Sequence, residues 1–95
     1  MNIKVLVLKI KIYAPWVHSL KEKRMVVKSL LAKIRNKFQV SVAEVEMQDV
    51  HQTIVIAVAA IAAHQAQADS MEEEILKFVE RSTEAEIVES ETEIR

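Results

Sequence analysis

Basic side chains on one predicted helix are the residues of this sequence best suited to contact another molecule. At the helical period of about 100° per residue, four of them share a narrow arc beside the apolar stripe, namely Lys21, Arg24, Lys28 and Arg35. Lys33 and Lys37 lie on the other flank. Lysine and arginine release counterions when they contact phosphates, so this arrangement is typical of nucleic-acid binding. The alternative is a solvated face whose long side chains cover the edges of the core.

The charge is divided between the two halves of the chain. Residues 1–38 carry ten bases against the single acid Glu22, a net charge of +9. Residues 39–95 carry three bases and thirteen acids, a net charge of −10, so the whole chain has a formal net charge of −1. Such a split indicates either a surface that binds polyanions or two halves that neutralise each other across the fold.

The residue types argue against catalysis and against a metal or cofactor. The chain has no glycine, which excludes glycine-rich phosphate loops, and no cysteine, which excludes thiolate catalysis and disulfides. His18, His51 and His64 fall in three separate predicted connections without a common spacing, so we expect no metal site. Asp49 stands near His51 but no nucleophile is placed beside them. We therefore expect no enzyme, and a small hydrolase is the weakest of the functional alternatives.

The first half of the chain predicts a strand and a helix. Ile3 to Tyr13 alternates apolar and other residues with period two, as a strand does. Ser19 and Glu22 form a capping box, with the Ser19 hydroxyl accepting from the Glu22 N–H and the Glu22 carboxylate reaching back. The helix then runs to about Phe38. Its predicted core-facing residues are Leu20, Val27, Leu30, Leu31, Ile34 and Phe38.

The second half predicts two strands, a helix and a last strand. Val40 to Met47 is a strand that places Glu44 and Glu46 on the same side, and Thr53 to Ala63 is apolar on both faces, which favours a central strand. The second helix ends near Ser82, with an apolar stripe of Met71, Ile75, Phe78 and Val79. It begins either at a capping box of Ser70 and Glu73, with Glu72, Glu73 and Glu74 in the first turn, or earlier, at residues 65–68.

Ile87 to Ile94 is the last predicted strand. Alternation places Glu89, Glu91 and Glu93 on one face, and Val88, Ser90, Thr92 and Ile94 on the other. Together with Glu86, these acids are typical of an edge strand that charge protects against aggregation.

This order, β-α-β-β-α-β, predicts one ferredoxin-like α+β domain over residues 1–95, with an antiparallel four-stranded sheet and two helices on one face. The other sheet face would be open. By parity it offers an apolar patch that we expect a second copy to cover in a homodimer: Val5, Val7, Val55, Ala57, Ala59 and Ile61. Base stacking on that sheet, as RNA-recognition motifs do, is not expected because only Tyr13 is available there.

Nothing in the sequence predicts a membrane segment. The N-terminal residues alternate and carry lysines at positions 4, 9 and 11, unlike a signal peptide, and the longest apolar run, Ile54 to Ala63, is too short to span a bilayer as a helix. With the absence of cysteine, these features favour a cytoplasmic protein without a membrane partner.

Two segments carry a family resemblance. Ser19 to Arg24 with Val27 to Leu30, and Val40 to Val45 with Gln48, Asp49 and Gln52, resemble the YlxP-like proteins, a bacterial family of unknown function. The resemblance implies a ferredoxin-like fold and no established activity. Because such genes are often neighbours of translation and ribosome-maturation genes, it also implies a role there. The matched positions are Ser19, Leu20, Lys21, Glu22, Lys23, Arg24, Ser41, Ala43, Glu44, Gln48, Asp49 and Gln52.

The matched residues differ in how well folding accounts for them. Capping explains Ser19 and Glu22, whereas folding does not require Lys21 and Arg24, which favours a binding role for those two. The chain departs from the family pattern at His51, where members often have tryptophan, and in lacking the usual glycines.

Two functional hypotheses follow. The first is an accessory protein that contacts RNA or the ribosome through Lys21, Arg24, Lys28 and Arg35. The second is a homodimeric module that binds by its open sheet face or by an edge strand. The sequence identifies no small-molecule ligand.

Overall fold

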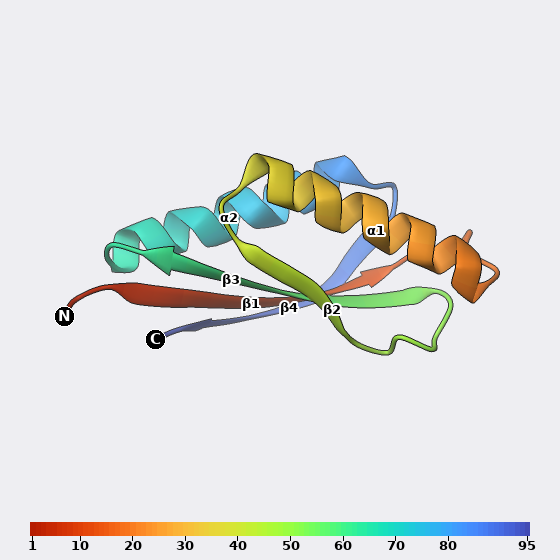
Figure 1. Ribbon diagram of the computed structural model, residues 1–95, viewed down its shortest axis with the longest axis horizontal. Helices are drawn as coiled ribbons and strands as arrows, with labels where there is room; N and C mark the ends of the chain where they lie inside the picture. The colour runs from red at the N-terminus through yellow and green to blue at the C-terminus, as the bar shows by residue number, and fades with distance from the viewer.

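The computed structural model describes residues 1–95 and confirms the predicted ferredoxin-like α+β fold (Figure 1). Four antiparallel strands form one sheet in the order β2-β3-β1-β4, so β3 and β1 are central and β2 and β4 are the edges. The elements are β1 Lys4–Tyr13, α1 Leu20–Lys37, β2 Ser41–Glu46, β3 Thr53–Ala62, α2 Gln65–Ser82 and β4 Glu86–Ile94.

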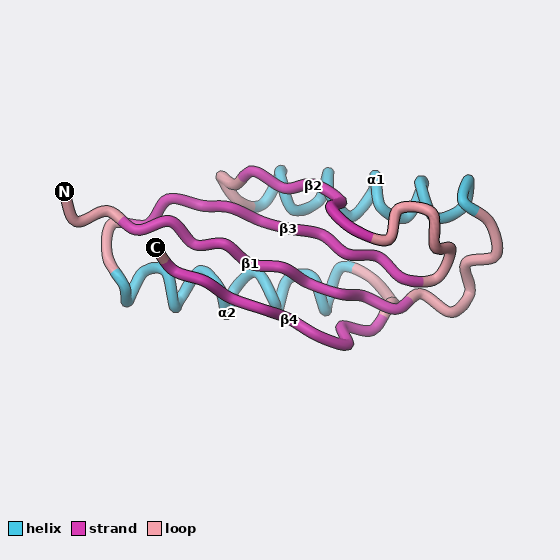
Figure 2. Tube along the Cα trace, turned by 90° about the horizontal axis from the view of Figure 1, so that it is seen from below, coloured by secondary structure: helices cyan, strands magenta, loops and turns pink.

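Both helices cover the same face of the sheet, and the core lies between the two layers (Figure 1). Every second residue of β1 from Leu6 to Ile12 is fully buried against the helices, as are the inward residues of β3. At one edge α1 runs alongside β2, whereas α2 lies behind β1 and β4 (Figure 2). Phe38, after α1, meets Phe78 of α2 edge-to-face with ring centroids 5.4 Å apart, which joins the helices.

The two helices begin at different kinds of cap. The Glu22 N–H donates to the Ser19 Oγ at 3.1 Å, as the capping box predicts, while the Glu22 carboxylate accepts from the His18 N–H at 3.0 Å. In α2 the cap is His64, whose Nδ1 accepts from the Gln67 N–H at 3.2 Å.

The predicted start of α2 at Ser70 is therefore wrong, and the alternative start at residue 65 is right. Glu72, Glu73 and Glu74 lie inside the helix and not in its first turn. The earlier start also places Ala68 on the core side, where it is fully buried.

Each edge strand contains a bulge that changes which face its side chains occupy. In β2 the register shifts between Glu44 and Glu46, so Val45 is an extra residue and Glu46 turns to the open face. The expectation that Glu44 and Glu46 share a side is therefore wrong. In β4 the register shifts between Glu89 and Ile87, so Val88 is an extra residue without a partner in β1. Neither α1 nor α2 combines the length and the hydropathy that a membrane-spanning helix needs.

Candidate nucleic-acid interface

All four predicted binding residues are exposed on α1 and free of acidic partners, and three of them make no hydrogen bond within the protein either. Lys21, Arg24 and Lys28 have no carboxylate within ion-pair distance, and they lie on the side of α1 that faces away from α2. We call these three residues, with Arg35, the basic flank. Lys21, Arg24 and Lys28 have no partner within the protein that they would have to leave before they contact an anion.

Arg35 belongs to the same flank but has a structural task as well. Its Nη2 donates to the main-chain oxygen of Val42 at 2.9 Å, which links the end of α1 to β2. This contact also shows on which side of the helix the flank lies, because β2 is the edge strand. The basic flank therefore borders the free edge of the sheet.

The opposite flank of α1 faces the second helix. The Lys33 Nζ donates to the main-chain oxygen of Ser82, the last residue of α2, at 3.0 Å. A lysine at this position satisfies a carbonyl that the helix end leaves without a partner. Lys37 is exposed on this side.

Ion pairs across the fold neutralise little of the charge split. Of the ten bases in residues 1–38, Lys9 and Lys23 contact carboxylates: Lys9 is 2.9 Å from Glu46 and 3.7 Å from Glu91, and Lys23 is 3.0 Å from Glu44. The remaining eight make no such pair. The bases of α1 lie beside β2, apart from the glutamates of β4 at the other edge of the sheet, whereas Lys9 and Lys11 of β1 lie next to those glutamates.

Lys23 is the residue that sequence reasoning missed. Only 1% of it is exposed, its Nζ donates to the Met47 main-chain oxygen at 2.7 Å, and it forms the ion pair with Glu44. A signal was present, because Lys23 precedes Val27 by four residues and Leu30 by seven, which places it inside the apolar stripe. A lysine at such a position needs partners in the interior.

The ion pair with Lys23 accounts for Glu44, which the sequence alone left unexplained. Glu44 faces the helices and its Oε2 is buried with no hydrogen-bond partner, so the Lys23 ammonium is what offsets its charge. Met47, whose carbonyl Lys23 holds, has φ of 56°, the left-handed region that non-glycine residues seldom adopt.

The neighbouring loop is tied down by an amide. The Nε2 of Gln52 donates to the main-chain oxygens of Pro15 at 2.9 Å and Val17 at 3.2 Å, which joins the β2–β3 loop to the β1–α1 loop. Gln48 and Asp49 are exposed, and nothing in the structure explains them.

The open sheet face has an apolar end and a charged end. At the apolar end the register sets Val5 opposite Ile61 and Val7 opposite Ala59, and Ile61 is 70% exposed. Ala57 is half-buried in the same row. Val55 does not belong to an exposed patch as predicted, because it is only 2% exposed.

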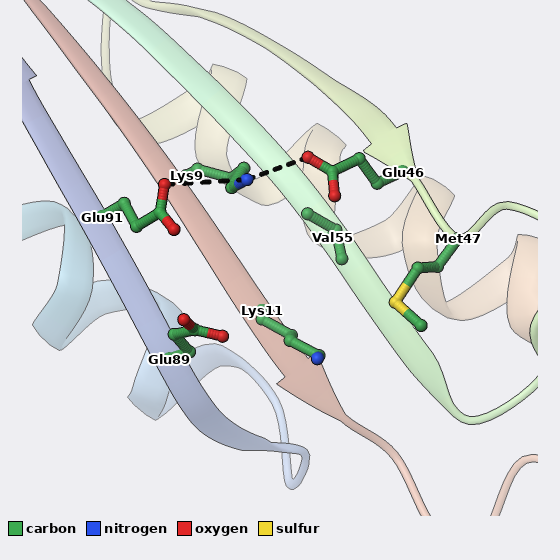
Figure 3. A pocket seen from close by; sticks show the side chains of 7 residues that line it. All are labelled: Lys9, Lys11, Glu46, Met47, Val55, Glu89 and Glu91. Carbon is green, nitrogen blue, oxygen red and sulfur yellow. Dashed lines mark hydrogen bonds and ion pairs between the residues drawn. The ribbon is translucent and has the colours of Figure 1, made fainter.

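At the charged end a cavity of about 90 Å³ is lined by two lysines, three glutamates, Met47 and Val55. Figure 3 shows the Lys9 ammonium between the carboxylates of Glu46 and Glu91. The hydrogen bond that the Lys9 ammonium donates to Glu46, together with the negative charges of Glu46 and Glu91, raises the pKa of Lys9 above its ordinary value. Lys9, Glu46 and Glu91 at this end of the open face are therefore already paired with one another.

The three histidines lie apart. His64 caps α2, and His18 and His51 are exposed in the β1–α1 and β2–β3 loops. No group of three or more histidine, aspartate or glutamate side chains is arranged to hold a metal ion.

Comparisons with known proteins agree with this architecture. The sequence model of a family described as "Protein of unknown function (DUF503)" matches residues 5–92. The "Uncharacterized protein YlxP" of Bacillus subtilis (strain 168) is 37% identical over 68 residues, which cover 72% of this chain and 74% of that protein. Among solved structures, the "De novo designed protein Foldit4" matches with a TM-score of 0.53 at 15% identity, over 99% of this chain and 94% of that one, which shows likeness of fold alone.

The buried ion pair generates a stability prediction. Replacing Lys23→Met leaves the Glu44 carboxylate buried and unpaired, so we expect the free energy of unfolding to fall by about 2–4 kcal/mol. Replacing both residues, Lys23→Met with Glu44→Met, should recover at least half of that loss, because no charge is then buried. Urea unfolding of the two variants measures both effects.

Lys28→Met is the matched control, since it makes the same substitution at an exposed position of the same helix. It should change stability by no more than about 0.5 kcal/mol. If Lys23→Met unfolds at the same urea concentration as this control, the buried pair has no structural role.

Proposed function

Because this chain belongs to the DUF503 family of proteins of unknown function, we propose its role from the geometry: a non-enzymatic accessory factor that contacts RNA through the basic flank of α1. The observation that carries the proposal is the row of exposed, unpaired cations at Lys21, Arg24 and Lys28. None of the contacts within the protein requires them, and phosphate is the anion that such a row suits best.

The length and position of the flank support this proposal. From Lys21 to Arg35 the helix rises by about 21 Å, enough to follow several phosphates of a nucleic acid. The glutamates of β4 lie at the opposite edge of the sheet, so a polyanion on α1 does not meet them. The separated charges would also orient the protein as it approaches RNA.

The family resemblance is what favours RNA on the ribosome as the ligand. The resemblance to YlxP-like proteins, whose genes are often neighbours of translation and ribosome-maturation genes, makes ribosomal subunits the natural probe and the cytoplasm the proposed compartment. Lys21 and Arg24 are among the positions that match the family, and both are exposed and without a folding role. These two residues are therefore the centre of the proposed contact.

Charge reversal of the exposed flank is expected to abolish binding. The wild-type protein should bind ribosomal subunits or total RNA and lose about 20-fold in affinity between about 50 and 200 mM salt, as three phosphate contacts to single-stranded RNA imply. The triple variant Lys21→Glu, Arg24→Glu, Lys28→Glu should lose at least tenfold at the lower salt, by about 1.4 kcal/mol or more. Arg35 is left in place because it bonds to β2.

A second triple variant controls for net charge. Lys4→Glu, Lys37→Glu, Arg81→Glu makes the same change in charge away from the basic flank, and it should bind nearly as well as the wild type. A folded flank variant with undiminished affinity, or equal losses in both variants, would contradict the proposal.

A specific observation favours a second candidate function, a homodimeric interaction module. The apolar end of the open sheet face exposes Val5, Ala59 and Ile61, beside a shallow hollow that Val40 and Ser41 also line. Both sheet edges resist strand pairing, because β4 carries glutamates and β2 is short and bulged. A second copy would therefore cover the face and not extend the sheet.

Size-exclusion chromatography with light scattering tests this candidate at micromolar concentration. If the face pairs two copies, the wild type runs as a dimer and Ile61→Lys as a monomer of unchanged stability, because Ile61 is 70% exposed within one chain. Met25→Lys, at a residue 66% exposed on α1, should leave the dimer intact. A monomeric wild type rules out this candidate, and unlike RNA contact, apolar pairing does not weaken with salt.

A further inference from the structure

The main chain of β2 has one edge that no strand covers. Val5 and Arg95 exchange both main-chain hydrogen bonds, at 2.9 and 3.0 Å, so the main-chain N–H and C=O of Val5 point towards β4. Along a strand, the main-chain N–H and C=O groups of successive residues point alternately to the two neighbouring strands. The β1–β3 and β2–β3 registers carry this alternation across the sheet to β2. There the main-chain N–H and C=O groups of Ser41 and Ala43 point towards β3, and those of Val42 and Glu44 point away from it.

The contact from α1 agrees with this assignment. Arg35 can reach the Val42 oxygen because that oxygen points outward, and the N–H of the same residue points outward with it. The N–H groups of Val42 and Glu44 are thus hydrogen-bond donors at the free edge, while the Val42 carbonyl is already occupied.

These donors and the basic flank run side by side. β2 is six residues long, about 20 Å, which matches the rise of about 21 Å from Lys21 to Arg35. Figure 2 shows α1 following β2 along this edge of the sheet. A chain lying along the edge would therefore meet cations on one side and outward N–H groups on the other.

We infer that the ligand of this edge is single-stranded RNA, with phosphates on Lys21, Arg24 and Lys28 and unpaired bases accepting hydrogen bonds from the outward N–H groups of Val42 and Glu44. This inference rests on the proposed function and narrows it. In a duplex the Watson–Crick edges of the bases are already paired, so those edges cannot use the two donors. The main-chain donors are the reason to expect a single strand over a duplex.

An acidic peptide that adds to β2 as a strand is the competing occupant. Such a peptide needs alternating donors and acceptors along the edge. Here Arg35 occupies the Val42 acceptor, and the bulge at Val45 interrupts the ladder. A base needs only a single donor, so the edge as it stands suits RNA better.

The test compares two forms of one RNA sequence on the whole protein. A single strand of about twelve nucleotides should bind at least about tenfold more tightly than the duplex of the same length at about 100 mM salt. On adding the single strand, the NMR signals of the Val42 and Glu44 amides should move. The amides of Ser41 and Ala43, which face β3, are the matched controls and should move less.

The outcomes separate this inference from the function on which it rests. Duplex binding as tight as single-strand binding, or shifts confined to α1 amides, would overturn the single-strand assignment while the basic flank remained an RNA contact. Absence of binding to either RNA form would overturn both. If a polyglutamate peptide, and not RNA, moves the Val42 and Glu44 amides, the edge is a peptide site and the inference is wrong.

Discussion

The ammonium of Lys23 is almost wholly withdrawn from water, and the position of α1 depends on what receives it. Removing a charge from water is costly, so it persists only with close partners, here the Met47 carbonyl at 2.7 Å and the Glu44 carboxylate at 3.0 Å. Both partners belong to β2 or directly follow it. The contact therefore fixes the first turns of α1 to the far end of β2.

Arg35 makes the second attachment, through the Val42 carbonyl. The two attachments are twelve residues apart on α1, about 18 Å along the helix axis. Together they hold the helix parallel to the sheet edge and fix its rotation, which leaves Lys21, Arg24 and Lys28 outside. The buried Lys23 and the bridging Arg35 thus determine in which direction the three exposed cations of α1 point.

Much of this architecture could be predicted because period-two alternation, helical spacing and one capping box are local signals. Alternation identified β1, the apolar run from Thr53 identified β3, and the arc of basic residues on α1 followed from helical geometry. The bulges at Val45 and Val88 could not be predicted, since an extra residue is visible only in the partner register. The cap at His64 was missed because the residues preferred at this position are serine, threonine, aspartate and asparagine, and Ser70 offered one of them further along the chain.

The candidate site was predictable to a different extent. The sequence identified the flank, but the roles within it depend on tertiary neighbours, which separate Arg35 from the other three bases. The burial of Lys23 depends on its partners in and after β2, which the sequence of α1 does not reveal. Val55 failed as an interface residue because the charged end of the open face, with Glu46 turned outward by the bulge, surrounds it.

If individual cations of the α1 flank bind phosphates, each of them releases counterions, and the number released can be counted. The measurement is the slope of log affinity against log salt for single-stranded RNA, taken for the wild type, Lys28→Ala and Lys37→Ala. If Lys28 holds a phosphate, its removal reduces the slope by about 0.7, and removal of Lys37 on the other flank leaves it unchanged. An identical slope for Lys28→Ala and the wild type would mean that Lys28 contacts no phosphate and that the flank does not bind RNA as proposed.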